Sequence, residues 1–363
     1  MEIEKSVYTF STLFDRAKKT HWPLVSVVVA AYNESSILYE HLTVICDYLV
    51  SIQSEFDWEL IIINDGSKDQ TGEIADQFAK ERDRVTVYHH PVNRGLGQSL
   101  QDGFQLTKGD YVVTLDIDLS CGPEYVLKMV QKLIESDADI VIASPYMKGG
   151  QMSNVPFHRK VLSIAANRFL SALAPGHLTS LTCMVRAYKG TFIRSLDLRA
   201  TGMEIMPEIL YKAMIMNGKI EEIPAHLDWS LQIQPESKRK SSMKIVSHTM
   251  ATIFTGFLLR PFLFIILPGI FLFLFSLYPI TWMFIHFFSE LENVSGEGAL
   301  HRASQALAIA YELHPHTFLV GLLSLVLSIQ LIASGFLSLQ NKQYYEEMYY
   351  LITHLRHGNT KKY

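Results

Sequence analysis

Two long runs of apolar residues in the last third of the chain constrain its fold more than any other feature. Phe262–Phe288 holds 27 residues and Thr317–Leu339 holds 23, and neither run contains an Asp, Glu, Lys or Arg. About 20 apolar residues are enough for a helix to cross the hydrocarbon core of a bilayer. The alternative is that both runs are buried core helices of a soluble protein. It is less favoured, because two such helices would need a large core around them in a chain of 363 residues. The sequence therefore predicts a two-helix transmembrane hairpin over residues 262–339.

The charges that flank the two runs predict how the hairpin is oriented. The segment between the runs, residues 289–316, carries one Arg and four Glu. Lys and Arg are enriched in the cytoplasmic loops of membrane proteins. We therefore expect a multi-pass integral membrane protein with a short outside loop over 289–316 and with both termini cytoplasmic. The basic flanks are Lys238, Arg239, Lys240, Lys244 and Arg260 before the first run, and Lys342, Arg356, Lys361 and Lys362 after the second.

Three further segments adjoin the hairpin or the soluble part. Residues 241–261 place apolar residues at helical spacing between basic ends, which is typical of an amphipathic interfacial helix lying along a membrane. A cytosolic extension of the first span is the alternative. Residues 1–22 are expected to form an N-terminal arm, and residues 340–363 a cytosolic C-terminal tail. Residues 23–240 then form a cytosolic domain.

The first part of that domain, residues 23–145, alternates between strand-like and helix-like segments. β-Branched runs predict buried strands, and apolar residues at helical spacing predict the helices between them. This alternation predicts an α/β fold with an open, mostly parallel sheet. The strands are expected at Val25–Ala31, Glu59–Asn64, Val85–His89, Tyr111–Asp116 and Asp139–Ala143, and the helices at Ser35–Ser51, Thr71–Arg82, Gly97–Leu106 and Pro123–Glu135.

Polar residues follow four of the expected strands at the points where these strands end. Open parallel sheets bind ligands in the crevice at the carboxyl ends of their strands. Neither a GxGxxG nor a GxxxxGK[ST] pattern is present, so the usual dinucleotide and Walker-type phosphate loops are not indicated. The polar residues are Tyr32, Asn33 and Glu34; Asp65, Gly66, Ser67 and Asp69; Asn93, Arg94, Gly95 and Gly97; and Asp116 and Asp118.

The fourth of these strands ends in two carboxylates, Asp116 and Asp118. Side chains at i and i+2 of an extended chain point the same way. Taking two like charges out of water is costly unless a cation or hydrogen bonds compensate. Carboxylate oxygens suit Mg²⁺ or Mn²⁺ better than zinc. The pair therefore predicts a divalent metal site, and a solvated loop with two neighbouring acids is the alternative.

The charge and the cysteines argue against two other classes of protein. The net charge of −4 lacks the basic signature of a nucleic-acid binder. Cys46, Cys121 and Cys183 lack metal-ligand spacing, so we interpret them as reduced thiols in a cytosolic compartment.

Four stretches together resemble the inverting family-2 glycosyltransferases of the GT-A fold, in both order and spacing: VSVVVAAYNESSIL, IIINDGSKDQT, NRGLGQSLQDGF and YVVTLDIDLS. Further along the chain, SPYMKGG, SLTCMVRAYKG, GMEIMPEILYKA and EIPAHLDWSLQIQPESK are similar to the polyprenyl-phosphate branch of that family, typified by dolichol-phosphate mannose synthase. The resemblance implies a GT-A (Rossmann-like) catalytic domain over residues 23–240 that uses Mg²⁺ or Mn²⁺.

The resemblance also implies roles for individual residues. On the donor side, the residues that would contact the nucleotide are Ala31, Tyr32, Glu34 and Asp65, while Asp116 would face the ribose or sugar and Asp118 would hold the metal on the diphosphate. On the acceptor side, Arg159 or Arg168 would bind the lipid phosphate, and Arg186 and Glu204 would shape the pocket. Lys238 would be a further donor-binding residue, in a loop that closes over the site.

The chain departs from the family pattern near the metal and the acceptor. Ser120 stands where members often have Gln, and Pro145 stands where they often have an Arg that binds phosphate. Cys183 takes the place of a Gly, and the Arg and Gly that members carry ahead of their Ser-Lys pair are absent from residues 232–236. These departures bear on the acceptor pocket and on the identity of the sugar more than on the fold.

The activity implied by the resemblance is transfer of a sugar from GDP-mannose or a UDP-hexose to a polyprenyl or dolichyl phosphate, with inversion, at the cytosolic face of a bilayer. The acceptor's phosphate oxygen is already ionised near neutral pH, so a strong general base is not needed. Two alternatives stay open: a transferase of the same fold that uses another lipid or glycan acceptor, and an inactive nucleotide-binding membrane scaffold. No nucleic-acid partner is expected, and a homo-oligomer stays open.

Overall fold

The computed structural model of the chain describes residues 22–173, 178–230, 260–295 and 298–358. The chain divides into two compact units, Met1–Thr255 with Ile352–Tyr363 and Gly256–Leu351, which are described one at a time. Three of the sequence predictions concern residues outside the described ranges: nearly all of the N-terminal arm 1–22, nearly all of the interfacial helix 241–261, and Lys238.

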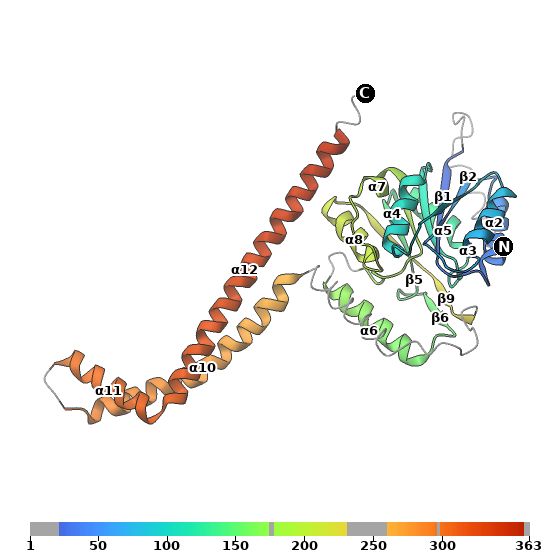
Figure 1. Cartoon of the computed structure of the whole chain (residues 1–363). Helices are drawn as coiled ribbons and strands as arrows, with labels where there is room; N and C mark the ends of the chain where they lie inside the picture. Colours follow the sequence, from blue (N-terminus) through green and yellow to red (C-terminus); the bar gives the residue numbers. More distant parts are fainter. Residues whose placement is uncertain (1–21, 174–177, 231–259, 296–297, 359–363) are drawn as a thin grey trace. The chain divides into compact units, whose positions relative to one another are not determined.

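The first unit is built on a seven-stranded sheet with the order β3-β2-β1-β4-β7-β5-β8 (Figure 1). β1 pairs in parallel with β2 and β4, β2 with β3, and β5 with β8, whereas β7 runs antiparallel between β4 and β5. The predicted α/β fold with a mostly parallel sheet is confirmed. The strands are β1 (Leu24–Ala31), β2 (Asp57–Asn64), β3 (Val85–His89), β4 (Tyr111–Asp116), β5 (Ile140–Ser144), β7 (Arg186–Lys189) and β8 (Ile220–Pro224).

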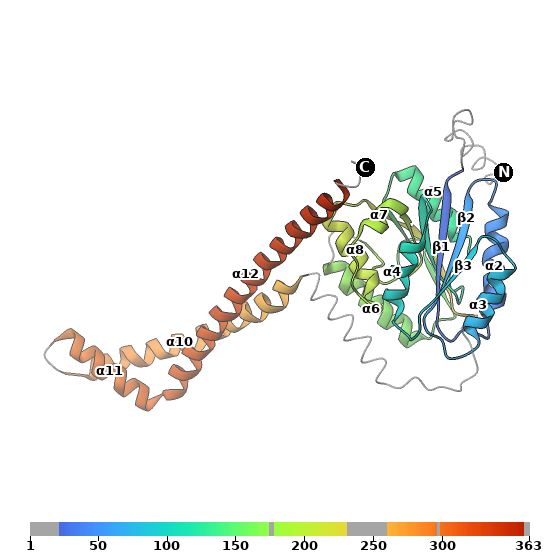
Figure 2. The ribbon, with the colours of Figure 1, turned by 45° about the horizontal axis from the view of Figure 1, so that its top comes forward.

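Helices cover both faces of this sheet, which explains why its central strands are continuous apolar runs rather than alternating ones. In β1, Val27, Val28 and Val29 are all completely buried. Three helices pack with one face of the sheet and three with the other (Figure 2). The first three are α2 (Leu38–Ser51), α3 (Thr71–Lys80) and α5 (Tyr125–Ser136), and the others are α4 (Leu96–Leu106), α7 (Gly190–Ser195) and α8 (Ile205–Ile215).

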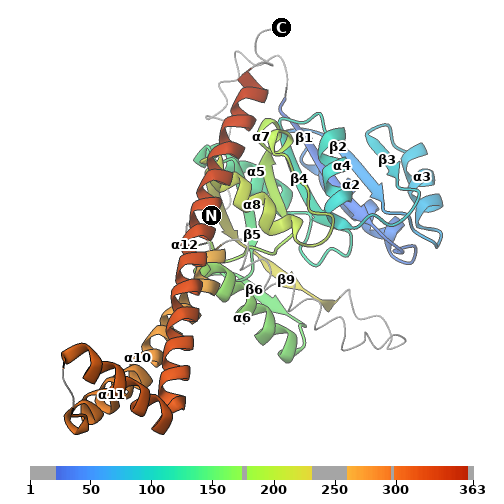
Figure 3. The same cartoon turned by 60° about the vertical axis from the view of Figure 1, so that its left-hand side comes forward.

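A small second sheet and one helix adjoin the β5 end of the unit (Figure 3). β6 (Gln151–Ser153) pairs in parallel with β9 (His226–Asp228), and the chain between β6 and β7 contains α6 (Phe157–Leu173). The backbone amide of Asp228 donates to the carbonyl of Ser120 at 2.8 Å. The small sheet is therefore attached directly to the turn that follows β4.

The second unit contains α10 (Pro261–Asn293), α11 (Ala299–Leu313) and most of α12 (Pro315–Gly358). Three glycines mark where α10 and α12 approach closely, because a Cβ built on each would lie 2.2–3.2 Å from an Ile side chain of the other helix. The pairs are Gly269 with Ile332, Gly321 with Ile280, and Gly335 with Ile266. The residue numbers rise along one helix as they fall along the other, so the two helices form the predicted antiparallel hairpin. Small residues at such contacts are typical of membrane helices.

α10 and α12 are long and apolar enough to cross a membrane, by length and composition. Their apolar windows are only 17% and 28% buried within the structure, which leaves many apolar side chains exposed. The segment 289–316, expected as a short loop, instead contains α11. This helix packs on α10 and buries Ala306 and Ala310 completely.

We expect Gly335→Val to weaken the hairpin, because the added side chain would start 2.2 Å from Cγ1 of Ile266 and would push the two helices apart. Overpacking of this kind costs about 1–3 kcal/mol. Thermal unfolding of the full chain in lipid nanodiscs should show a lower midpoint than the wild type. Leu337→Val is the matched control. Because Leu337 is 60% exposed, the unfolding midpoint of this variant should equal that of the wild type.

Candidate functional site

The carboxyl ends of β1, β2, β3 and β4 meet along one side of the sheet, called here the carboxyl edge. The register places Ala31 beside Asn64, Asn64 beside His89, and Ala30 beside Asp116. The polar segments that the sequence places after these four strands therefore lie next to one another, as predicted.

The loops after β1 and β2 are joined by four hydrogen bonds that the sequence did not reveal. The amide of Asn33 donates to Ser67 Oγ, and Asn33 Oδ1 accepts from the amide of Lys68. Two more amides, those of Glu34 and Ser35, donate to the side chains of Thr71 and Asp69. Asn33 has a φ of 57°, in the left-handed region that Asn tolerates better than most residues. The two loops therefore form one rigid rim.

Asp69 anchors this rim as an ionised carboxylate. Burial on its own would raise the pKa of Asp69, but hydrogen bonds from Thr71 and Ser35 outweigh it and lower the pKa to about 2. Its role could have been suspected from its place after a strand and from Thr71 two residues on, yet its other partner, Ser35, lies 34 residues away and has no local signal.

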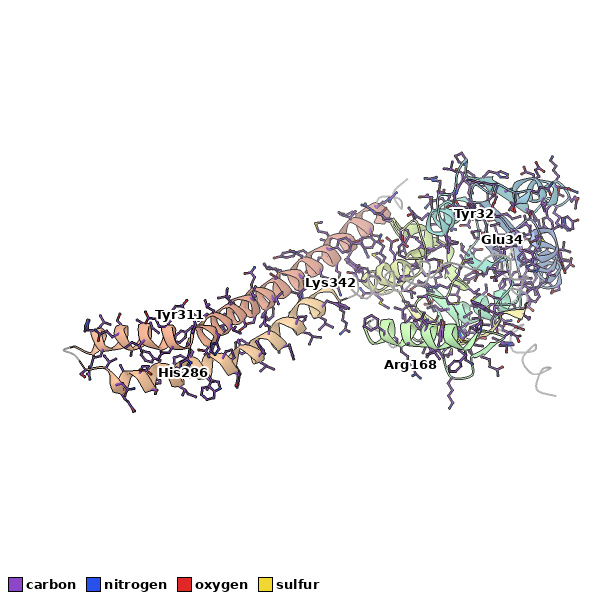
Figure 4. The ribbon with its side chains drawn as sticks, turned by 60° about the horizontal axis from the view of Figure 1, so that its bottom comes forward. Tyr32, Glu34, Arg168, His286, Tyr311 and Lys342 are labelled. Carbon is purple, nitrogen blue, oxygen red and sulfur yellow. The ribbon has the colours of Figure 1, made fainter. Side chains whose placement is uncertain are left out.

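The candidate nucleotide-binding residues lie on this rim and at its base. Ala31 is buried at the end of β1, Tyr32 is 41% exposed, and Glu34 is partly buried. Figure 4 shows Tyr32 and Glu34 close to one another, at some distance from Arg168 on α6. The exposed ring of Tyr32 offers a flat apolar surface on which a base could stack.

Asp65 lies just beyond β2 and is 3% exposed. Each of its carboxylate oxygens accepts two hydrogen bonds, with lengths between 2.7 and 2.9 Å. The donors are His90 Nδ1 and the amide of Arg94 on Oδ1, and Asn93 Nδ2 and the amide of Gly95 on Oδ2. Asp65 thus holds the loop between β3 and α4. Its predicted contact with a base stays a prediction.

Asp116 and Asp118 lie in a tight turn at the end of β4. The turn is closed by the amide of Leu119, which donates to the carbonyl of Asp116, and Leu119 has a φ of 52°. Asp118 Oδ1 accepts from the amide of Ser120 at 2.9 Å. The buried His41 of α2 contacts the carbonyl of Ile117 through Nδ1 at 2.7 Å. The turn is therefore held from within, from α2 and from β9.

The electrostatics of the pair favour a bound cation. Burial and the charge of Asp118 raise the pKa of Asp116 from its ordinary value to about 7. Within the part of the chain that the structure describes, no side chain or amide donates a hydrogen bond to the Asp116 carboxylate. A divalent ion would remove both the repulsion and the lack of a partner.

The donor set fits Mg²⁺ or Mn²⁺ bound together with a phosphate-bearing ligand. Among the described residues, no group of three or more His, Cys, Asp or Glu side chains could hold a metal ion by itself. Ions of this kind usually keep several waters and bind through one or two carboxylates plus substrate phosphates. Two carboxylates at the carboxyl edge match that pattern, whereas a zinc site closed by protein ligands would not.

The two arginines predicted for the acceptor side do not lie together as Asp116 and Asp118 do. Arg159 and Arg168 both lie on α6, nine residues apart, which places them on about opposite sides of the helix. They cannot both face one phosphate. Arg168 is exposed, and of Arg159 only the backbone is described.

Arg186 differs from its predicted role in shaping an acceptor pocket. It is completely buried in β7, and its guanidinium donates to the carbonyls of Met206 and Leu181, both at 2.7 Å. Its contacts are therefore structural. Glu204 accepts from the amide of Gly202 in the segment before α8.

Comparisons with known proteins agree with this arrangement. Residues 26–195 match the family model described as glycosyl transferase family 2. The sequence is 31% identical over 206 residues to the undecaprenyl-phosphate mannosyltransferase of Micrococcus luteus, covering 55% of this chain and 82% of that one. It is 29% identical over 219 residues to the dolichol-phosphate mannosyltransferase of Pyrococcus furiosus, covering 60% of this chain and 59% of that protein.

The chain is also similar to one further relative and to one solved structure. The dolichyl-phosphate beta-glucosyltransferase of Trichomonas vaginalis is 28% identical over 229 residues, covering 61% of this chain and 69% of that protein. Among solved structures, glucosyl-3-phosphoglycerate synthase from Mycobacterium tuberculosis, in complex with Mn²⁺, uridine diphosphate and glucosyl-3-phosphoglycerate, is 22% identical with a TM-score of 0.48, covering 65% of this chain and 79% of that one.

The raised pKa of Asp116 predicts that this residue destabilises the metal-free protein at alkaline pH. Between about pH 4 and pH 7 the folded state binds the proton that the unfolded state has lost, so stability falls as the pH rises and then levels off. Asp116→Asn removes this penalty. We expect the metal-free variant to be more stable than the wild type at about pH 8, by up to about 4 kcal/mol. At about pH 4 this advantage in stability should be largely lost, because Asp116 of the folded wild type is then protonated. Thermal unfolding in a chelating buffer at both pH values measures this.

Proposed function

Since the chain belongs to glycosyl transferase family 2, we propose that it moves a sugar from GDP-mannose or a UDP-hexose to a polyprenyl or dolichyl phosphate, with inversion. Relatives named as polyprenyl- or dolichyl-phosphate glycosyltransferases support the acceptor class. The two long apolar helices support a protein anchored in the bilayer where such lipids reside.

The observation that carries the proposal is the state of Asp116. A partly buried carboxylate beside a second carboxylate, with a pKa near 7 and without a hydrogen-bond donor among the described residues, is unfavourable in the free protein. Structural acids are normally satisfied by hydrogen bonds, as Asp65 is at the same edge. Such strain is typical of a site that becomes stable only when its ligand binds.

For this reaction, the site must stabilise the leaving group and position the nucleophile. A divalent cation at Asp116 and Asp118 would supply compensation for the charge that develops on the nucleoside diphosphate as the glycosidic bond breaks. Asp118 is the proposed metal ligand on the diphosphate side, and Asp116 is proposed to face the ribose or sugar. The amide of Ser120 donates to Oδ1 of Asp118 and so fixes the orientation of this carboxylate in the turn after β4.

The remaining donor contacts are proposed for Ala31, Tyr32, Glu34 and Asp65. Their positions along the carboxyl edge support the assignment, because the rim between β1 and β2 is rigid and lies beside the pair of carboxylates. The phosphate oxygen of the acceptor attacks without a strong general base, since that oxygen is already ionised.

The acceptor phosphate is proposed to bind on the side of α6 that carries Arg168. Phe157, Val161 and Arg168 stand at positions i, i+4 and i+11 of the helix, so they share one face. All three are exposed, and Phe157 is 81% exposed. An apolar strip beside a guanidinium suits a lipid that carries a phosphate. We place the first unit and both termini on the cytosolic side, following the charges around the spans.

A donor panel tests the activity directly. The full chain in membranes would receive labelled GDP-mannose, UDP-glucose or UDP-N-acetylglucosamine together with a polyprenyl phosphate and Mn²⁺. Label extracted with the polyprenyl phosphate supports the proposal and identifies the donor. Label on a neutral lipid or a glycan supports a different acceptor, and nucleotide binding without any transfer supports an inactive scaffold.

Asp118→Asn should lower metal-dependent transfer by about a hundredfold or more, because an amide cannot compensate the charge of a divalent ion as a carboxylate does. The variant should keep the thermal midpoint of the wild type. Asp83→Asn, at an exposed position between α3 and β3, is the control and should transfer normally. Near-normal turnover of Asp118→Asn would contradict the metal assignment.

Arg168→Gln should raise the KM for the polyprenyl phosphate by about tenfold and leave the KM for the donor unchanged, since a charged hydrogen bond to phosphate is lost. Arg159→Gln, on the other side of α6, should have a smaller effect. Steady-state kinetics with each substrate varied in turn distinguishes the two. Equal effects of both variants on the donor would mean that α6 serves the fold and not the acceptor.

A further inference from the structure

His90 is a buried residue that the proposed reaction does not use. It follows β3 directly, and its side chain is 1% exposed. Nδ1 lies 2.7 Å from Oδ1 of Asp65, and Nε2 lies 2.9 Å from Oδ2 of Asp102 on α4. One imidazole therefore bridges two carboxylates from two different elements.

The two contacts together define the protonation state of the ring. Ionised carboxylates only accept hydrogen bonds, so both ring nitrogens must donate, and that requires the imidazolium form. A neutral ring would turn one bare nitrogen toward a carboxylate inside the protein. The other charged or titratable groups that face His90 are Arg94, whose Nη1 lies 3.4 Å from the same Asp102 oxygen, and Tyr88, whose ring meets that of His90 edge to face at 5.7 Å.

The neighbouring His89 shows that this arrangement is specific to His90. Nε2 of His89 lies 2.9 Å from Asp76, whereas its Nδ1 lies 2.9 Å from Nδ2 of Asn64. The amide orientation of Asn64 is consistent, because its Oδ1 accepts from the amide of Ser67. One nitrogen of His89 donates and the other accepts, so a neutral ring satisfies both contacts. His89 is also exposed.

The loop that Asp65 and His90 hold leads into the start of α4, which contacts the segment that precedes α8. Asp65 also holds the amides of Arg94 and Gly95, at the point where α4 begins. The amide of Gly97 donates to the carbonyl of Thr201 at 2.7 Å, and a Cβ on Gly97 would lie 2.1 Å from the carbonyl oxygen of Ala200. The start of α4 and the segment 200–202 therefore touch through backbone atoms. A shift of the loop after β3 would therefore be transmitted to the segment 200–202.

We infer that His90 is a positioning residue: as an imidazolium between Asp65 and Asp102 it holds the loop after β3 and the start of α4 in the geometry that binds the donor nucleotide. This inference rests on the proposed function, because it gives the Asp65 loop a part in donor binding. Loss of either contact of the ring should loosen the loop and weaken nucleotide binding.

Calorimetric titration of the full chain in nanodiscs with UDP or GDP, each with Mn²⁺ at one fixed pH, tests the inference. His90→Gln should bind the better nucleotide about tenfold more weakly than the wild type, the loss expected when a buried charged acceptor loses a donor. His89→Gln is the matched control and should follow the wild type.

Asp102→Asn keeps the imidazole and removes one negative charge at a position whose side chain is 25% exposed, so it guards against a His90 variant that fails to fold. This variant should also bind the nucleotide more weakly than the wild type. Wild-type affinity in His90→Gln, or equal effects of His89→Gln and His90→Gln, would overturn the inference.

Nitrogen-15 spectra of the histidine rings separate this inference from the proposed function. Near neutral pH, His90 should carry protons on both ring nitrogens, whereas His89 should carry one. A neutral His90 would overturn the inference whether or not a nucleotide binds. Failure of the wild type to bind either nucleotide, with a charged His90, would instead overturn the proposed function and the positioning role together.

Discussion

The cost of taking carboxylates out of water governs how this molecule is arranged at the carboxyl edge of its sheet. Two acids lie there, Asp65 buried and Asp116 partly buried, and their surroundings differ. Asp65 receives hydrogen bonds on both oxygens from the loop after β3. Asp116 faces the charge of Asp118, and its pKa rises to about 7. The first acid organises the fold, while the second is left for a ligand to satisfy.

The sheet topology makes this contrast possible. Parallel strands end on the same side, so the loops after β1, β2, β3 and β4 are neighbours although their residues are far apart in sequence. Those loops are then cross-linked by side chains: Asn33 and Asp69 join the first two, and His90 joins the third to α4. The result is a rigid frame around one strained pair of acids, which is the arrangement that a site for a charged donor requires.

Much of the architecture could be predicted because its signals are local. Charge-free runs of more than twenty residues predict α10 and α12, and β-branched runs predict the strands. α11 was not predicted, because it buries only the small side chains of Ala306 and Ala310 against α10. Such a helix has no strong apolar stripe of its own. The reversed strand β7 was missed for a similar reason, since the pairing of a four-residue strand with β4 and β5 leaves no local pattern.

The sequence by itself determined the class of fold, the two apolar helices, the polar strand ends and the pair Asp116 and Asp118, because each depends on side-chain pattern within a short window. Tertiary structure alone decided which of these groups have partners. It buried Arg186 among backbone carbonyls and placed Asp65 and Asp102 on either side of His90. Burial and hydrogen bonding between distant residues set the charge state of an ionisable group, and neither is written in the order of neighbouring residues.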